Sequence, residues 1–241
     1  MSARFGRPRV HYRLTDSTNA RARELALRGA PDGTVVTADE QTAGRGRQGR
    51  AWSAPPRKAL LASVLVRDLT RRDALLPLAV PVAVAEASDD FAGSSCGIKW
   101  PNDIWIGGRK LCGILLEGRP QEGWAVIGIG LNVGTTREEF PEVLRDTATS
   151  LTIESGRDPG VETVLEAVLS RLDARLADRP ATILDAWRDR DVLLGNRIRW
   201  NGGEGVAAGL AEDGGLLVDT GSGRLALDAG EVHLLRPDVS S

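Results

Sequence analysis

The segment from Gln41 to Trp52 constrains the fold of this chain more than any other part of the sequence. It reads Gln-Thr-Ala-Gly-Arg-Gly-Arg-Gln-Gly-Arg-Ala-Trp, so glycine and arginine fill six of the seven positions 44–50. Glycine has no side chain to pack and arginine resists burial, so we expect a mobile loop outside the core. Amide and guanidinium groups in such a loop are typical of a site that wraps an anion, above all a phosphate. A solvated basic loop without a ligand is the simpler alternative.

Gly44, Gly46 and Gly49 also spell G-x-G-x-x-G, the dinucleotide-binding fingerprint, after a stretch that reads as a strand. That fingerprint binds a pyrophosphate only where a helix begins at its last glycines. Here Pro55 and Pro56 follow, and consecutive prolines strongly disfavour a helix at this point. The sequence therefore argues against a Rossmann fold.

The overall composition is that of an ordinary globular protein. The chain has 241 residues and a net charge of −2, which fits one or two domains without a global field for nucleic acid or membrane surfaces. No apolar run reaches the ~18 residues that span a bilayer, and no secretory signal is recognisable, so we expect a cytoplasmic protein. Cys96 and Cys112 are then free thiols, and His11 and His233 are expected to have structural roles.

Short apolar runs predict a series of strands, several of them close together in the sequence, which favours antiparallel pairing. The expected strands are 10–14, 34–38, 59–66, 97–100, 104–106, 110–117 and 124–133. The expected helices are 20–28, 73–91 with a kink at Pro77 and Pro81, 137–144, 159–176 and 180–190. Gly107-Gly108 reads as a two-residue hairpin turn. These elements predict an α+β fold, with a mixed, mostly antiparallel sheet flanked by helices.

The composition changes near Asp191. From Leu193 to Leu235 short apolar runs alternate with glycine-rich turns, which predicts a small β barrel of about five strands and SH3-like size. We therefore expect a larger domain over residues 1–190 and a smaller one over 191–241. The tail after Arg236 is expected to be frayed.

Two polar groups of the N-terminal half are candidates for ligand binding. Ser17-Thr18-Asn19 stands at a predicted helix start, where capping is the simplest explanation, although its hydroxyl and amide groups also suit a polar ligand. Gln41 opens the glycine–arginine loop, and Trp52 closes it. The indole of Trp52 could cover an apolar ligand or an adenine, or pack in the core.

Two further motifs contain two of the three lysines of the chain. Lys99-Trp-Pro-Asn-Asp103 is either an ordinary Asx turn or a ligand rim, where the Asp103 carboxylate could hold Mg²⁺ together with phosphates. In the strand 110–117, simple alternation places Lys110 on one face with Cys112, Ile114 and Leu116. On this otherwise apolar face Lys110 either extends to solvent or faces an anion, and Gly113 permits a close approach.

Together these motifs resemble those of biotin protein ligases. The matching text, in the order and at the spacing of that family, is Ser17-Thr-Asn19, Gln41 to Arg50 with Trp52, Lys99-Trp-Pro-Asn-Asp103, Lys110-Leu-Cys-Gly-Ile114 and Gly128-Ile-Gly-Leu-Asn-Val133. The glycine-rich C-terminal part fits as well, so the resemblance covers essentially the whole chain. It implies a class II synthetase-like catalytic fold over 1–190, which binds biotin and ATP, and an SH3-like domain over 191–241.

The resemblance implies a reaction and assigns residues to it. Biotin is activated with ATP to biotinyl-5'-AMP, and the biotinyl group passes to a lysine of a biotin carboxyl carrier protein. The implied biotin contacts are Ser17, Thr18, Asn19, Gln41, Arg45, Gly46, Arg47, Trp52, Lys110 and Gly113. The implied nucleotide contacts are Arg50, Trp52, Asn102, Asp103 and Asn132, with Asp103 as the magnesium ligand. Lys110, Arg45 and Arg47 are the implied catalytic residues, because joining two anions requires positioned cations.

ATP with magnesium and biotin are thus the expected substrates, without a tightly bound prosthetic group. The expected partner is the carrier domain of an acyl-CoA carboxylase; formation of a homodimer is left open. Because the Ser-Thr-Asn motif begins at residue 17, no room remains for the DNA-binding domain that some relatives carry, and we expect neither DNA nor membrane binding. A lipoate protein ligase and a nucleotide-sensing module are the rivals. The glycine–arginine loop with Lys99 to Asp103 favours biotin over lipoate.

Overall fold

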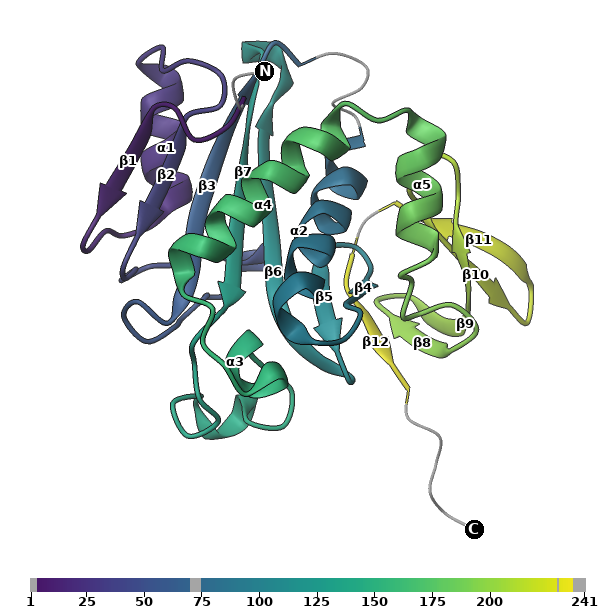
Figure 1. Ribbon diagram of the computed structural model, residues 1–241. Helices are drawn as coiled ribbons and strands as arrows, with labels where there is room; N and C mark the ends of the chain where they lie inside the picture. The colour runs from purple at the N-terminus through teal and green to yellow at the C-terminus, as the bar shows by residue number, and fades with distance from the viewer. Residues whose placement is uncertain (1–3, 70–74, 229, 236–241) are drawn as a thin grey trace.

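The computed structural model describes residues 4–69, 75–228 and 230–235, which form two sheets and five α-helices (Figure 1). The strands of the first sheet, called the large sheet, are β1 (Arg9–Tyr12), β2 (Val35–Ala38), β3 (Ala59–Arg67), β4 (Gly97–Lys99), β5 (Asp103–Ile106), β6 (Arg109–Arg119) and β7 (Trp124–Asn132). Their spatial order is β1-β2-β3-β7-β6-β5-β4. Only β1 and β2 run parallel among these neighbours, which confirms a mixed, mostly antiparallel sheet.

The β5–β6 connection confirms the predicted hairpin turn. Ile106 pairs directly with Arg109, so the loop has two residues, Gly107 and Gly108. Their φ angles are 54° and 76°, a left-handed conformation that glycine adopts without steric cost. This turn fixes where β6 begins, and hence where Lys110 stands on it.

The helices are α1 (Thr18–Leu27), α2 (Leu76–Ala92), α3 (Leu151–Ser155), α4 (Val161–Leu176) and α5 (Pro180–Arg188). Pro77 lies in the first turn of α2, where its missing N–H breaks no bond, and Asp73 lies outside the described residues. The predicted helix 137–144 is wrong, because only a 3₁₀ turn, Glu142–Leu144, forms after the extended Pro141. The short α3 was not predicted, although Ser150 caps it by accepting from the Ile153 N–H at 3.1 Å.

The two faces of the large sheet are covered differently. Figure 1 shows α2 and α4 lying across one face, where α4 packs on β3 and α2 packs on β4, β5 and β6. Alternate side chains of the sheet such as Leu60, Val64 and Ile127 belong to the same buried cluster as these helices. On the opposite face α1 packs against a smaller cluster of buried residues: Val36, Leu65, Trp124 and Val126. The part of this second face next to α1 carries the cavity described below.

The second sheet, called the small sheet, contains β8 (Arg197–Trp200), β9 (Gly203–Leu210), β10 (Leu216–Thr220), β11 (Gly223–Leu227) and β12 (Val232–Leu234). Its order is β11-β10-β9-β8-β12, and all neighbours are antiparallel, as expected for a small SH3-like domain. β12 pairs with β8, and the residues just before β12 contact the glycine–arginine loop, where Arg47 donates to the Gly230 carbonyl. The predicted tail after Arg236 lies outside the described residues.

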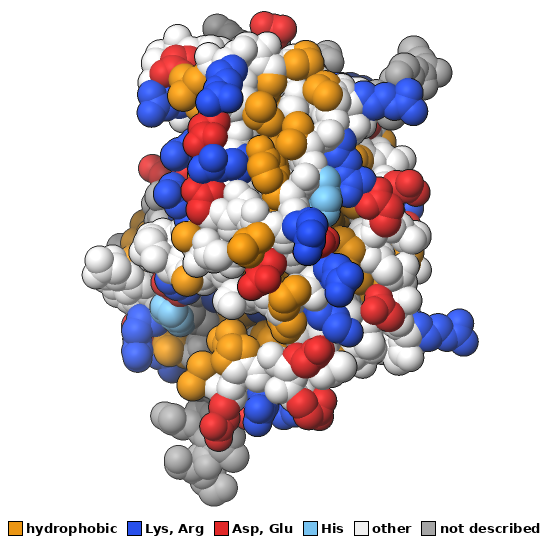
Figure 2. All heavy atoms as spheres, turned by 90° about the vertical axis from the view of Figure 1, so that its left-hand side faces the viewer, with side chains coloured by type: hydrophobic (Ala, Val, Ile, Leu, Met, Phe, Trp, Pro, Cys, Tyr) orange, Lys and Arg blue, Asp and Glu red, His pale blue; other side chains and the backbone are white. Residues whose placement is uncertain are grey.

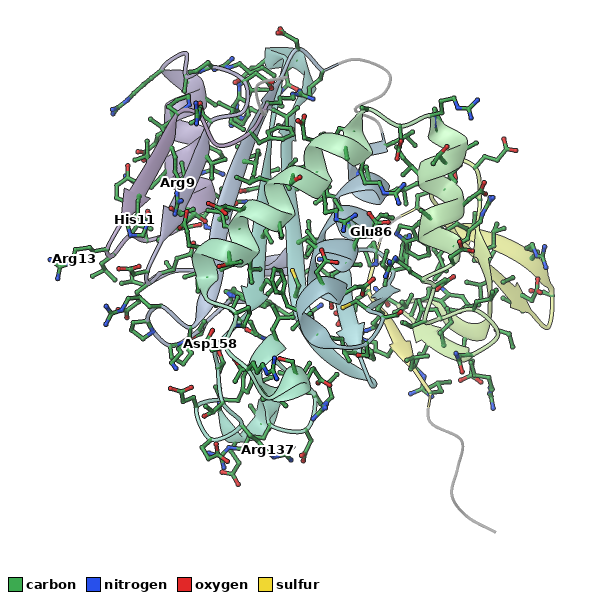
Figure 3. The ribbon with its side chains drawn as sticks, in the orientation of Figure 1. Arg9, His11, Arg13, Glu86, Arg137 and Asp158 are labelled. Carbon is green, nitrogen blue, oxygen red and sulfur yellow. The ribbon has the colours of Figure 1, made fainter. Side chains whose placement is uncertain are left out.

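The outer edge of the large sheet, at β1, is polar. Arg9, His11 and Arg13 lie along this edge, on the side away from the small sheet (Figure 3). His11 Nδ1 is 3.0 Å from the Thr37 hydroxyl, consistent with the structural role predicted for it. Figure 2 shows acidic and basic side chains intermixed over the face that contains this edge. Across the described ranges, no helix combines the length and apolar character needed to cross a bilayer.

Candidate active site

One cavity of about 370 Å³ brings together the residues that the sequence predicted to bind ligands. It lies on the large sheet between α1, the glycine–arginine loop and the segment before β12. The predicted residues that line it are Ser17, Thr18, Asn19, Gln41, Arg45, Gly46, Arg47, Arg50, Trp52, Asn102, Asp103, Lys110, Gly113 and Asn132. These residues come from segments more than 100 positions apart, so the fold, and not sequence proximity, assembles the site.

The floor of the cavity is made of glycines on β6 and β7. A Cβ added at Gly128 would lie 2.3 Å from Asn19 Oδ1, and one at Gly130 would lie 2.5 Å from Trp52 Cε2. Neither position can therefore carry a side chain unless Asn19 or Trp52 moves. The missing side chains let both residues lie directly on the sheet and leave room for a ligand between them.

The polar end of the cavity is held by hydrogen bonds among side chains of different elements. The Thr18 backbone N–H and hydroxyl donate to Gln41 Oε1 at 2.7 and 3.1 Å. Because the amide oxygen of Gln41 is used in this way, its NH₂ group is the end left for other partners. Ser17 occupies the N-cap position of α1, but its side chain makes no capping hydrogen bond, so capping does not explain this residue.

Asn19 is fixed from both sides. Its Nδ2 atom donates to Glu117 Oε2 at 2.8 Å, and Ser63 Oγ lies 2.5 Å from its Oδ1 atom. An ionised carboxylate only accepts hydrogen bonds, so Glu117 sets which end of the amide faces it. Arg23 donates to the other Glu117 oxygen at 3.2 Å and completes this support. Neither Glu117, at the end of the predicted strand 110–117, nor Ser63 was predicted to support the site.

The glycine–arginine loop forms a small hairpin over the cavity. The Gly46 N–H donates to the Arg50 carbonyl at 2.7 Å, and the Trp52 N–H donates to the Gly44 carbonyl at 2.9 Å. Gln48 and Gly49 turn the chain with φ angles of 54° and 75°. The residues after it, 52–55, are not helical, which confirms the argument against a dinucleotide-binding fingerprint.

Cationic side chains converge on the cavity. Lys110 Nζ lies 2.8 Å from Asp103 Oδ1 and 5.8 Å from the centre of the Trp52 ring. Arg47 donates to Asn102 Oδ1 at 3.2 Å and to the Gly230 carbonyl at 3.3 Å. Burial lowers the pKa of the Arg47 guanidinium, because its charge has lost water. A bound anion would offset that loss.

Lys99, like Arg47, is a partly buried cation, and it lies beside the indole of Trp105. Its Nζ atom lies 4.9 Å from the Trp105 ring centre, and burial lowers the pKa of its ammonium group. Lys99 therefore adds positive charge to the same side of the cavity as Lys110.

The predicted alternation along β6 is wrong at its start. Lys110 pairs with Trp105 and Cys112 pairs with Ile104, so Leu111 is an extra residue that forms a bulge. A bulge re-aims the side chains beside it. Lys110 thus shares a face with Gly113, whose added Cβ would lie 3.2 Å from Lys110 Nζ, while Cys112 is fully buried in the core. Burial raises the pKa of the Cys112 thiol, which therefore packs as a small hydrophobic side chain and does not act as a nucleophile.

Several residues lining the cavity were not predicted. Among them are the apolar Phe140, Leu144 and Ala148 after β7, and the segment Gly230-Glu231-Val232 before and at the start of β12. Glu231 forms an ion pair with Arg50 of the loop. The helix wrongly predicted over 137–144 hid Phe140 and Leu144, and no local pattern marks the segment before β12.

The cavity offers few protein side chains that could bind a metal ion without help from a substrate. Within the parts of the chain that the structure describes, no three His, Cys, Asp or Glu residues lie close enough to hold an ion. The predicted ligand Asp103 has one oxygen paired with Lys110, and Asn102 Nδ2 donates to the Ile114 carbonyl at 2.7 Å. A single available carboxylate fits a magnesium ion that is bound mainly by the phosphates of the nucleotide and by water, with only one or two ligands from the protein.

Comparison with known proteins supports the family resemblance found in the sequence. Residues 11–133 match the biotin/lipoate A/B protein ligase family, and residues 194–235 match the biotin protein ligase C-terminal domain. The bifunctional ligase/repressor BirA of Bacillus subtilis is 34% identical over 95% of this chain and 75% of its own length. The biotin--[acetyl-CoA-carboxylase] ligase of Mycobacterium tuberculosis is 35% identical over 92% of this chain and 87% of its own.

Among solved structures, the biotin protein ligase of Aquifex aeolicus in complex with biotin and ATP is similar over its whole length. The TM-score is 0.83 at 30% sequence identity, and the match covers 95% of this chain and 99% of that one.

Proposed function

The chain belongs to the biotin protein ligase family, and we propose that this cavity binds biotin and ATP side by side and joins them as biotinyl-AMP. The enzyme is a ligase whose substrates are biotin and ATP. The observation that carries the assignment of the site is the convergence of Lys110, Arg45 and Arg47 on one glycine-floored cavity. The roles of individual residues below are part of the proposal.

Biotin would occupy the end of the cavity next to α1. Ser17, Thr18, Asn19 and Gln41 would bind its ureido ring, which has both donors and acceptors. This is supported by the free NH₂ end of Gln41 and by the Ser17 hydroxyl, which capping does not use. Trp52 and Gly113 would enclose the apolar part of biotin, since the Trp52 ring lies close against Gly113 and Gly130 of the glycine floor.

ATP would occupy the end nearer the small sheet. Arg50, Asn102, Asp103 and Asn132 would contact the nucleotide, with Asp103 reaching the magnesium that accompanies the phosphates. The ion would supply positive charge to the phosphate oxygens. Buried cations at this end support the placement, because Arg47 and Lys99 both lie where a negative charge would be favourable.

The first step joins two anions. A biotin carboxylate oxygen bonds to the α-phosphorus, and the bond from that phosphorus to the pyrophosphate oxygen breaks. Lys110, Arg45 and Arg47 would offset the repulsion and stabilise the charge that develops in the transition state. Each such positioned contact contributes about 2 to 4 kcal/mol to lowering a barrier of this kind. Gly46 would let the loop backbone approach the adenylate closely.

In the second step the neutral amine of a carrier lysine attacks the biotinyl carbonyl carbon, and AMP leaves with the bonding electrons of the anhydride. The loop hairpin would keep water away from the reactive acyl group until the lysine enters. We propose the carrier domain of an acyl-CoA carboxylase as the acceptor and the cytoplasm as the location. The two buried free cysteines support a reducing compartment.

Transfer to a carrier domain tests the complete proposal. The enzyme is incubated with ATP, magnesium, a purified biotin carboxyl carrier domain and either biotin or lipoate, and the acceptor is analysed by mass spectrometry. We expect one biotinyl group on a single lysine and no lipoyl group. Lipoylation in place of biotinylation would reject the biotin assignment, and no modification with either acid would reject the transfer.

A further inference from the structure

Residues 190–192, which lie between α5 and the small sheet, pair with the edge of the large sheet. The Ile98 N–H donates to the Arg190 carbonyl at 2.7 Å, and the Val192 N–H donates to the Ile98 carbonyl at 3.1 Å, which makes Asp191 a parallel bridge partner of Ile98. This segment, 190–192, thus extends the large sheet beyond β4. Gly97 is needed for this, because an added Cβ would lie 2.1 Å from Val192 Cγ1.

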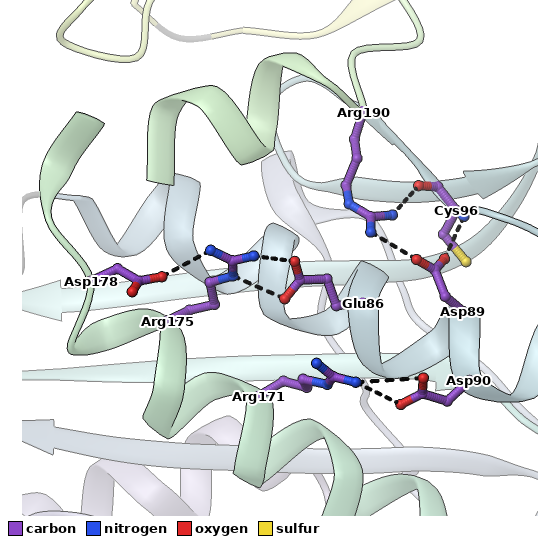
Figure 4. Close-up of polar contacts among 8 residues, drawn as sticks. All are labelled: Glu86, Asp89, Asp90, Cys96, Arg171, Arg175, Asp178 and Arg190. Carbon is purple, nitrogen blue, oxygen red and sulfur yellow. Dashed lines mark hydrogen bonds and ion pairs between the residues drawn. The ribbon is translucent and has the colours of Figure 1, made fainter. Parts of the chain in front are cut away.

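The side chain of Arg190 locks that segment in place (Figure 4). Its guanidinium donates to the Cys96 carbonyl at 2.8 Å and to Asp89 Oδ2 at 2.7 Å. Asp89 belongs to the last turn of α2, and its other oxygen accepts the Cys96 N–H at 2.6 Å. Arg190, Asp89 and Cys96, here called the edge clamp, therefore tie the helix, the start of β4 and the segment 190–192 together.

The clamp is connected to the cavity through the small sheet. Residues 190–192 lead into β8, and β8 pairs with β12 from Arg197 to Trp200. The residues just before β12, Gly230 and Glu231, then contact the loop: Gly230 accepts from Arg47, and Glu231 pairs with Arg50. Through β8 and β12, the position of segment 190–192 on β4 is thus linked to these two loop contacts.

We propose that Arg190 is a positioning residue for the ligase reaction, which sets the place of Gly230 and Glu231 against the loop arginines by fixing segment 190–192 on β4. The inference rests on the proposed function, because it assigns Arg190 a role in ATP and adenylate binding. Arg190 touches no substrate and acts through the loop. A misplacement of about 1 Å far from the reacting atoms can cost up to ~10²-fold in rate, so the effect is measurable.

The chain supplies a burial-matched control. Arg175 of α4 pairs with Glu86 of α2, and these side chains are 20% and 16% exposed, against 18% and 25% for Arg190 and Asp89. The acidic partner of each arginine, Glu86 or Asp89, belongs to α2, as Figure 4 shows, but the hydrogen bonds of Arg175 on α4 go to Glu86 and Asp178, outside segment 190–192. Arg175→Ala therefore removes a comparable ion pair without touching the path to the loop.

The test measures biotin-dependent pyrophosphate release against ATP concentration, and the rate at which biotinyl-AMP leaves the enzyme, in parallel with the thermal unfolding midpoint. For Arg190→Ala we expect a KM for ATP raised about tenfold and faster loss of biotinyl-AMP. Arg190→Lys, which keeps one charged contact, should recover part of this loss. Arg175→Ala should lower the midpoint while its KM stays that of the wild type.

The double variant Arg190→Ala with Glu231→Gln separates positioning from general stability. If Arg190 acts through the Glu231 contact, the second substitution adds little to the first, whereas independent effects add. Equal KM values in Arg190→Ala and Arg175→Ala, or additive effects in the double variant, would overturn the inference. If Arg190→Ala does not fold, Asp89→Asn takes its place, and Asp90→Asn, at the exposed neighbouring position, is the control. The inference then requires the KM for ATP to rise in Asp89→Asn and to stay at the wild-type value in Asp90→Asn. A wild-type enzyme inactive with biotin would instead reject the proposed function.

Discussion

Lys110 Nζ lies 2.8 Å from Asp103 Oδ1, across the hairpin that joins β5 and β6. The Leu111 bulge turns Lys110 toward the cavity, and Asp103 holds its ammonium group there. We expect Lys110→Ala to keep the fold and to lower the rate of biotinyl-AMP formation about 10²- to 10³-fold, the usual effect of losing one positioned contact to a developing charge. Single-turnover formation of biotinyl-AMP measures this directly.

Arg109→Ala is the control for that substitution. Arg109 is the neighbouring cation on β6, but it pairs with Glu154 at 2.9 Å and does not line the cavity. Its loss should leave the chemical step unchanged. A wild-type rate in Lys110→Ala would refute the role proposed for this lysine, whatever the behaviour of the control.

The glycine floor gives a second prediction. In Gly130→Ala the new methyl group would lie 2.5 Å from Trp52 Cε2, so the indole has to lift from the sheet into the biotin space. We expect the KM for biotin to rise by about tenfold or more while the protein stays folded. Gly221→Ala, where an added Cβ meets open space, is the control. An unchanged KM for biotin in Gly130→Ala would show that Trp52 does not bound the biotin site.

Lys110 and Trp52 illustrate which features of the site could be predicted from the sequence and which could not. Motif positions identified the cavity residues because the motifs lie near the ends of strands or at the start of α1, and such ends meet at one site. The orientation of Lys110 could not be read from alternation, because the bulge at Leu111 depends on how β6 pairs with β5. The Arg50–Glu231 contact joins the glycine–arginine loop to the segment before β12, 181 positions later in the chain, and no local pattern encodes it.

Cys112 is predicted to be chemically silent. Burial raises the pKa of its thiol, so the thiolate needed for alkylation does not form near neutral pH. Cys112→Ala should retain the wild-type rate of pyrophosphate release and lose only about 1 kcal/mol of stability for the small cavity it creates. Intact-mass measurement after iodoacetamide treatment should show native Cys112 unmodified at pH 7. Inactivation by alkylation at this residue would contradict its assignment as a packing residue.

Asp191 gives a prediction for pH dependence. Burial raises the pKa of its carboxyl group; one oxygen accepts the Leu193 N–H at 2.8 Å, and Oδ2 is buried with no hydrogen-bond partner among the described residues. The Asp191 carboxyl group therefore keeps its proton up to a higher pH in the folded state than in the unfolded state. Stability therefore falls as pH rises from the ordinary carboxyl pKa through the raised one.

Asp191→Asn should remove this cost, because a buried neutral amide is less unfavourable than a buried charge and can still accept from Leu193. We expect the variant to unfold at a higher temperature than the wild type at pH 7. The difference should vanish below the ordinary carboxyl pKa, where both side chains are neutral. Thermal unfolding across this pH range measures it, and a difference independent of pH would contradict the titration of Asp191.

The most direct measurement of the central claim is pyrophosphate release from ATP and magnesium without a carrier protein, with biotin or with lipoate as the acid. If the cavity makes and retains biotinyl-AMP, biotin should give a rapid burst of pyrophosphate close to the enzyme concentration, followed by slow turnover, and lipoate should give none. Release that does not depend on biotin, or a burst of equal size with lipoate, would contradict the account.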